Sequence, residues 1–325
     1  IEENIEESCI CFDVTGRGFT GGSYVGEAST REIVNWIKKN YKIDDNRIYL
    51  LGQSNGGYAT YSIAQNYPNL SAAIFPQLGN PNIRTVDNLL NTSIYQMVSP
   101  KDHAFVGHVN EVKNAIKKFG NYYQYDFKEM IHHSMTHYIY HKDVLNEMLK
   151  TKRNLYPNKI IYITEHNRHV ESFWIKLHGI SKGNKVAKIK AEIVNNKLIE
   201  IIVKGSDGIT VTLTPKIDRQ DFAVKINNKV FNFKEYESNK LIFRKDKGWA
   251  IAESELPIDY RKGTGLLDIY LNSMRIILPK SETKILRETA ENFARPFTNG
   301  FDPVVYTNYP IYLDNEMPAH ILSYN

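Results

Sequence analysis

The stretch that most constrains the fold runs from residue 47 to residue 64. A short apolar segment at 48–51 is followed at once by Gly52-Gln53-Ser54-Asn55-Gly56, and then by residues of helical composition. An apolar run of this length is typical of a buried strand, and glycines allow the chain to turn sharply. The order strand, tight turn, helix predicts that Ser54 lies exposed at the tip of the turn.

Gly-x-Ser-x-Gly between a strand and a helix is the pattern of a nucleophile elbow. The turn is strained, so the positions two before and two after the serine, Gly52 and Gly56, are expected to need almost no side chain. The following helix directs backbone N–H groups and its positive dipole end to the place where an oxyanion would develop. We therefore predict Ser54 as a nucleophile and the backbone N–H of Asn55 as an oxyanion donor. The alternative is an ordinary glycine-rich turn.

A serine hydroxyl needs a base, usually a histidine that is oriented by a carboxylate. In chains with this elbow the acid and the histidine come later, each on a loop after a strand. Asp102 meets the first condition, because it follows a strand predicted at 93–98. We predict Asp102 as the acid, against the alternative of an ordinary turn aspartate.

The base is expected after the next strand, predicted at 122–127. Three histidines follow that strand: His132, His133 and His137. We predict His132 as the base, with His133 and His137 as alternatives. A rival interpretation takes His133, His137 and His141, spaced four apart, as ligands of one metal on a helix. It lacks a His-Glu-x-x-His pattern and leaves Ser54 without a role, so we predict no metal.

Up to about residue 150, apolar runs alternate with helical patterns, which predicts a parallel sheet covered on both faces. The predicted strands are 9–13, 48–51, 72–75 (ended by Pro76), 93–98 and 122–127, and the predicted helices are 29–41, 108–119 and 138–150. From residue 159 short alternating strands with turn residues between them predict a β-sandwich-like domain. We therefore expect an α/β catalytic domain at 1–155 and a β-rich accessory domain at 156–325, which carries one helix at 281–293.

Composition narrows the possible partners. The net charge of this 325-residue chain is +5, and its lysines are scattered along the sequence rather than clustered. No basic stripe is interleaved with aromatics, so we predict no nucleic-acid partner. No apolar run approaches the ~20 residues that span a bilayer. Cys9 and Cys11 alternate within the first predicted strand, which predicts a buried face of small residues rather than a disulfide or a metal clip.

With these residues in place, the first 150 positions resemble an α/β-hydrolase. They are most similar to bacterial esterases related to polyhydroxybutyrate depolymerases and feruloyl esterases, a group that merges with the prolyl-oligopeptidase family. The resemblance rests on residues 16–18, 43–58 and 67–73, and it extends to the acid at Pro100-Lys101-Asp102. Two positions depart from the family pattern: Asn55 replaces the usual Met, and Ile131 replaces the usual Gly before His132.

The resemblance implies hydrolysis of small-molecule or polymer carboxylic esters through an acyl-enzyme, without a cofactor. A serine peptidase of the prolyl-oligopeptidase type is an alternative within the same chemistry. A second alternative is a non-catalytic glycan- or polymer-binding protein on a degenerate hydrolase scaffold, which the 21 tyrosines and the absence of an oxyanion loop ahead of the elbow motivate. Because the family has further N-terminal strands, we expect a fragment cut at both ends, with an exposed sheet edge.

Overall fold

The computed structural model describes residues 9–12, 14, 24–102, 113–126 and 142–259, with short pieces at 276–278, 288 and 311–313. Residues 1–10 and 41–265 form one compact unit, and residues 11–40 and 266–325 form another. In the described part of the chain, no helix is both long and apolar enough to cross a membrane.

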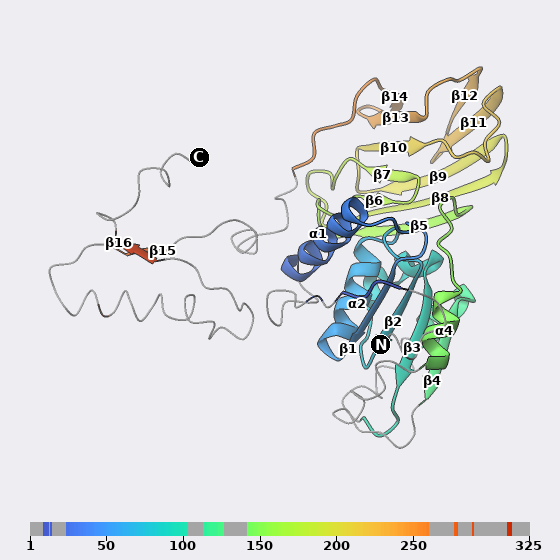
Figure 1. Ribbon diagram of the computed structural model, residues 1–325. Coiled ribbons are helices and arrows are strands. Elements are labelled where there is room, and N and C mark those ends of the chain that lie inside the picture. The colour runs from blue at the N-terminus through green and yellow to red at the C-terminus, as the bar shows by residue number, and fades with distance from the viewer. Residues whose placement is uncertain are drawn as a thin grey trace. The chain divides into compact units, whose positions relative to one another are not determined.

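The first unit begins with a parallel sheet of four strands in the order β1-β2-β3-β4 (Figure 1). Helical segments alternate with the strands, as expected for the α/β class. The elements are β1 (Tyr49–Gln53), α2 (Asn55–Asn66), β2 (Ala73–Gln77), the 3₁₀ helix η2 (Ile83–Asn91), β3 (Ser93–Val98), the 3₁₀ turn η3 (Lys117–Phe119), β4 (Tyr122–Asp126) and α4 (Lys142–Leu149). The predicted α/β class is thus confirmed, and the strand predicted at 93–98 has the same bounds in the structure.

Each face of this sheet has its own core, because successive residues of a strand point to opposite sides. Phe75 and Met97 pack with Val144, Leu145 and Met148 of α4. The neighbouring positions pack on the other side, against α2 and η2, in a cluster that contains Tyr61, Ile74, Val86, Leu89 and Ile94. β1 lies at the edge of the sheet, and its Leu51 is 40% exposed, so this strand is less buried than its apolar sequence predicts.

β2 differs from its prediction because it continues through Pro76 to Gln77. The register between β2 and β3 pairs Ile74 with Ile94 and then Gln77 with Met97, and it passes over Pro76. A proline has no N–H to donate to a ladder, so it is tolerated where the ladder to the next strand is interrupted.

The strand predicted at 9–13 is also wrong over the residues that the structure describes. Residues 9–12 belong to no strand, and the side chains of Cys9 and Cys11 are both exposed. The predicted buried cysteine face is therefore absent, because alternation over so few residues does not specify a strand without a partner.

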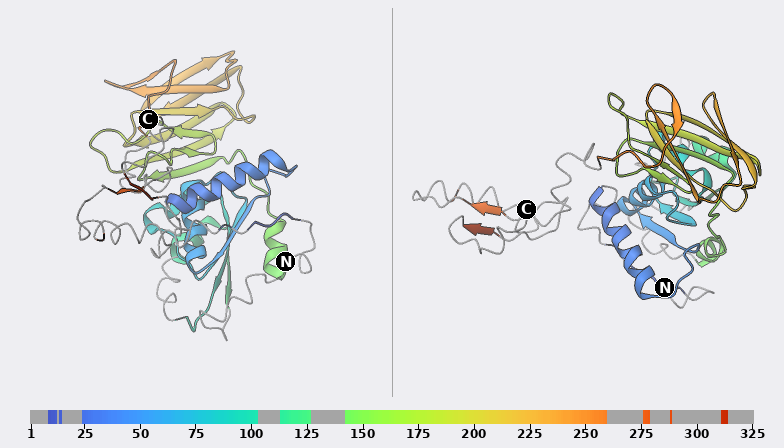
Figure 2. Two further views of the ribbon diagram at one scale, coloured as in Figure 1. Left: turned by 60° about the vertical axis from the view of Figure 1, so that its left-hand side comes forward. Right: turned by 90° about the horizontal axis from the view of Figure 1, so that it is seen from above.

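From residue 159 the first unit consists of strands, in two five-stranded sheets. One sheet has the order β12-β11-β9-β8-β5, with β5 (Lys159–Thr164), β8 (Ala187–Asn195), β9 (Leu198–Lys204), β11 (Asp221–Ile226) and β12 (Lys229–Lys234). The other has the order β14-β13-β10-β7-β6, with β6 (Glu171–Ser172), β7 (Ile175–Leu177), β10 (Gly208–Thr212), β13 (Lys240–Lys245) and β14 (Trp249–Ile251). Figure 2 shows both as yellow-green to orange strands. They share one hydrophobic core, to which Tyr162, Trp174, Phe222 and Phe243 contribute large side chains.

Side-chain hydrogen bonds join the parallel sheet to these strands. The Asn88 amide of η2 donates to the Ile163 carbonyl at 2.9 Å and accepts from the Ile163 N–H at 2.8 Å, as a neighbouring strand would. The same amide donates to the Gln65 carbonyl of α2 at 2.8 Å. The Tyr162 hydroxyl donates to the Asn66 carbonyl at 2.9 Å. The helices behind the predicted elbow are thereby attached to β5.

The second unit contains α1 (Tyr24–Asn40) and a parallel pair, β15 (Ile276–Leu278) with β16 (Ile311–Leu313). α1 begins five residues before the helix predicted at 29–41. The rings of Phe12 and Trp36 meet edge to face with centroids 6.3 Å apart. The helix predicted at 281–293 lies outside the described residues except for Glu288, which is helical.

Candidate active site

Ser54 joins the last residue of β1 to the first residue of α2, and its backbone is unusual. Its φ is 54° and its ψ is −114°, a region that favours glycine. The N–H of Ser54 donates to the Gln77 carbonyl of β2 at 2.9 Å, and its carbonyl accepts from the Tyr58 N–H at 3.0 Å. Holding a serine in such a conformation costs about 1–3 kcal/mol, and it persists only where the surrounding structure enforces it.

Close backbone contacts explain the turn. A Cβ on Gly52 would lie 2.2 Å from the Gly56 carbonyl oxygen, so this position excludes any side chain. A Cβ on Gly56 would meet nothing within 4 Å, contrary to the prediction that both motif glycines need to be small. The third residue after the serine is the constrained one instead: a Cβ on Gly57 would lie 2.5 Å from the Gln77 carbonyl oxygen, and one on Gly79 would lie 2.4 Å from the Gly57 carbonyl carbon.

Asp102 lies in the turn after β3, where its N–H donates to the Ser99 carbonyl at 3.1 Å. Only 4% of Asp102 is exposed, which is unusual for an aspartate in a turn. In a parallel sheet the carboxyl ends of all strands lie at the same edge, where α/β proteins place their ligands. Ser54 follows β1 and Asp102 follows β3, so both belong to that edge.

Tyr58, near the start of α2, senses the charge of Asp102. The pKa of the Tyr58 hydroxyl is raised, mainly by burial and to a smaller extent by the negative charge of Asp102. A hydrogen bond with the Asn80 side chain opposes this rise. Sequence reasoning missed both Tyr58 and Asn80 as site residues. The close approach of α2 to the loop after β2 brings Asn80 to Tyr58.

The buried side-chain amide of Gln96 holds the loop after β2 in place. Gln96 of β3 accepts a hydrogen bond from the Tyr61 hydroxyl at 2.7 Å and donates to the Gly79 carbonyl at 3.0 Å. The Tyr122 hydroxyl of β4 lies 3.2 Å from the same amide oxygen. Burial raises the pKa of Tyr61 and Tyr122, so both hydroxyls keep their protons as donors. A glutamine in the middle of the apolar strand 93–98 was the sequence signal for this network.

The structure describes only some of the remaining predicted site residues. Asn55 is the first residue of α2, so its backbone N–H belongs to the first turn, whose N–H groups have no partner within the helix. The candidate bases His132, His133 and His137 lie outside the described residues, as does His141. Over the ranges that the structure describes, no group of three or more His, Cys, Asp or Glu could hold a metal.

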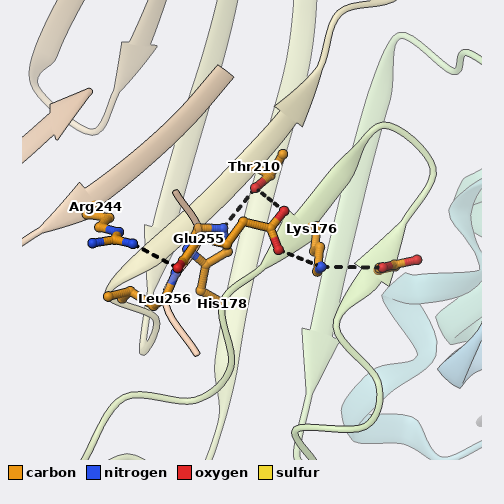
Figure 3. A network of polar contacts seen from close by, with 7 residues as sticks. Lys176, His178, Thr210, Arg244, Glu255 and Leu256 are labelled. Carbon is orange, nitrogen blue, oxygen red and sulfur yellow. Dashed lines mark hydrogen bonds and ion pairs between the residues drawn. The ribbon is translucent and has the colours of Figure 1, made fainter. Parts of the chain in front are cut away.

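A second polar cluster lies in the β-rich part and is shown in Figure 3. His178 Nδ1 accepts from the Leu256 N–H at 3.2 Å, and its Nε2 lies 2.8 Å from the Thr210 hydroxyl. The hydroxyl donates to Glu255 at 2.8 Å, and Lys176 bonds the other oxygen of that carboxylate at 2.6 Å. Burial lowers the pKa of His178 to about 4, an effect that the charge of Glu255 opposes.

The hydrogen bonds of the cluster fix the protonation of the His178 ring. Since Nδ1 accepts from an N–H, the neutral ring carries its proton on Nε2 and donates to Thr210. Arg244 adds a bond of 2.8 Å to the Glu255 carbonyl. The cluster therefore attaches residues 254–256, which lie in no strand, to β7, β10 and β13.

Comparisons with known proteins give similarities of low coverage. No family model matches the chain, and no curated protein matches it. Among solved structures, a thermostable esterase is 20% identical over 39% of this chain and 36% of its own, with a TM-score of 0.37. An acylaminoacyl peptidase of Pyrococcus horikoshii is 15% identical over 43% of this chain and 29% of its own (TM-score 0.36). The S-formylglutathione hydrolase FrmB of Staphylococcus aureus is 12% identical over 40% of this chain and 63% of its own, with a TM-score of 0.34. The chain thus spans less than two thirds of each of these proteins.

Proposed function

We propose that residues 1–155 form an α/β-hydrolase catalytic domain that cleaves carboxylic esters, with Ser54 as the nucleophile. The observation that carries the proposal is the conformation of Ser54. A serine held at φ 54° between a parallel strand and a helix is costly, and strain of this kind is concentrated at functional sites. The buried Asp102 at the same sheet edge supports it.

In the proposed reaction the Ser54 Oγ attacks the acyl carbon while His132 takes the hydroxyl proton. The backbone N–H of Asn55 stabilises the oxyanion of the tetrahedral intermediate. As this collapses, His132 returns the proton to the departing alcohol and an acyl-serine remains. A water, deprotonated by the same histidine, then releases the acid and restores Ser54. Asp102 orients the imidazole through its second nitrogen.

The residues after 155, in two sheets over a shared core, are proposed as a β-sandwich-like accessory domain. The Asn88 and Tyr162 bonds support a fixed attachment of this part to α2 and η2. These bonds lie at the C-terminal end of α2, the end away from Ser54.

Intact-mass labelling with a fluorophosphonate tests the proposal on the full chain. We expect one adduct on the wild type and none on Ser54→Ala. Ser62→Ala is the matched control, because Ser62 lies on α2 outside the turn and its loss should leave labelling unchanged. An adduct on Ser54→Ala would contradict the assignment. No adduct on the wild type would favour the non-catalytic binding protein.

The same assay assigns the base. His132→Ala, His133→Ala and His137→Ala are compared for the rate of labelling, and we expect a large loss for His132 alone. Aryl esters and amino-acid anilides offered to the wild type then separate an esterase from a peptidase. Turnover of the anilides at rates comparable to the esters would support the peptidase instead.

A further inference from the structure

Five lysines lie at one end of the sheet that contains β8 and β9, four of them between residues 182 and 190. We call them the lysine face: Lys182, Lys185, Lys188, Lys190 and Lys204. The loop that carries the first two packs against the turn after β9. There the Ser181 N–H donates to the Gly205 carbonyl at 2.9 Å, and a Cβ on Gly205 would lie 2.2 Å from the Val186 carbonyl oxygen.

The strand register places these lysines opposite uncharged or like-charged partners. Lys188 lies opposite Lys204 of β9, and Lys190 lies opposite Ile202. On the β5 side, Ile163 lies opposite Lys188 and Ile161 lies opposite Lys190. Over the residues that the structure describes, no lysine of this face forms an ion pair.

The other end of the same face is neutralised. Lys159 pairs with Glu192 at 3.9 Å, Lys225 with Glu200 at 2.9 Å, and Lys197 with Asp221 at 3.3 Å. Like charges directly opposite in a sheet are destabilising. In the described part of the chain, the lysines at the other end of this face have no such ion pair.

The residues among these lysines indicate the kind of partner. Ile202 is 55% exposed and Val186 is 38% exposed. The outward positions of β8 and β9 carry neither arginine nor an aromatic residue. Bidentate phosphate recognition and stacking on bases or sugars therefore have no support here. Lysines interleaved with exposed aliphatic side chains suit the headgroup region of an anionic bilayer, where lysine binds charge and the apolar groups insert shallowly.

We propose that the lysine face binds the surface of an anionic lipid bilayer. The proposal goes beyond the hydrolase activity and does not depend on Ser54. Its occupant is a membrane surface that lies on the face, with Lys188, Lys190 and Lys204 toward the headgroups and Ile202 between them.

Sedimentation with lipid vesicles tests it on the full chain. Vesicles of phosphatidylcholine alone are compared with vesicles that contain one third phosphatidylserine, at 50 mM and 500 mM NaCl. We expect binding to the anionic vesicles only, weakened by salt. Each lysine near such a surface contributes about fivefold in affinity, so the triple change Lys188→Gln, Lys190→Gln and Lys204→Gln should weaken binding about 100-fold.

The matched control removes the same charge from the neutralised end of the face, through Lys159→Gln, Lys197→Gln and Lys225→Gln. It should retain most of the binding, because those lysines already have carboxylate partners. An equal loss in both triple variants would overturn the proposal, since net charge alone would explain it. Equal binding to both kinds of vesicle, or binding to sulfated polysaccharide or duplex DNA without binding to vesicles, would also overturn it.

Discussion

Ser54→Gly should stabilise this protein relative to Ser54→Ala, although both changes remove the proposed nucleophile. Both variants lack the hydroxyl, so their difference in unfolding free energy isolates the backbone at φ 54° and ψ −114°. Alanine keeps the steric cost of that conformation, and glycine does not.

The magnitude follows from two opposing terms. Removing the strain at Ser54 is worth about 1–3 kcal/mol. Glycine also makes the unfolded chain more flexible, which costs about 0.4–1 kcal/mol relative to alanine. We therefore expect Ser54→Gly to be about 1 kcal/mol more stable than Ser54→Ala, as measured by urea unfolding followed by circular dichroism.

Ser62 provides the matched control on α2, where the backbone is helical. There the order should reverse, with Ser62→Gly about 1 kcal/mol less stable than Ser62→Ala. If Ser54→Gly is equal to Ser54→Ala or less stable, the turn stores no strain, and the main support for a nucleophile at this position is lost.

Three further outcomes are expected from urea unfolding. Gly52→Ala should lower the free energy of unfolding by about 2 kcal/mol or more, because the new Cβ would meet the backbone of Gly56. Gly56→Ala should raise it by about 1 kcal/mol, because the Cβ there enters open space. Equal effects of the two changes would refute the packing argument. Asn88→Ala removes three hydrogen bonds of a buried side chain and should cost about 3 kcal/mol. Asn91→Ala, which removes an exposed bond to the Lys159 carbonyl, should cost less than about 1 kcal/mol. Between pH 6.5 and about 4, His178 is protonated in the unfolded chain but not in the folded chain. The free energy of unfolding should therefore fall by about 3 kcal/mol as the pH is lowered through this range. A His178→Gln variant with the same pH dependence would contradict this.

Local patterns predicted most of the parallel sheet. The strand at 93–98 and the turn at Ser54 depend on residues that are neighbours in sequence, and there the periodicity and the glycine spacing were sufficient. The pattern failed where a partner decides the outcome. The Cys9 segment alternates like a strand but is in no ladder, and Pro76 continues a strand because the ladder to β3 is interrupted beside it.

The sequence by itself determined that this chain alternates strands and helices before residue 150, turns sharply at Ser54, and continues as short strands. Only the tertiary structure decided that Gly57 rather than Gly56 must be small, and that Asn80 and the charge of Asp102 both act on Tyr58. It also placed Lys204 opposite Lys188, beside the lysines at 182–190. The physical reason is the same in each case, because these contacts join segments that are far apart in the chain. Strand register and close packing of the backbone bring such segments together, and no local sequence pattern encodes either of them.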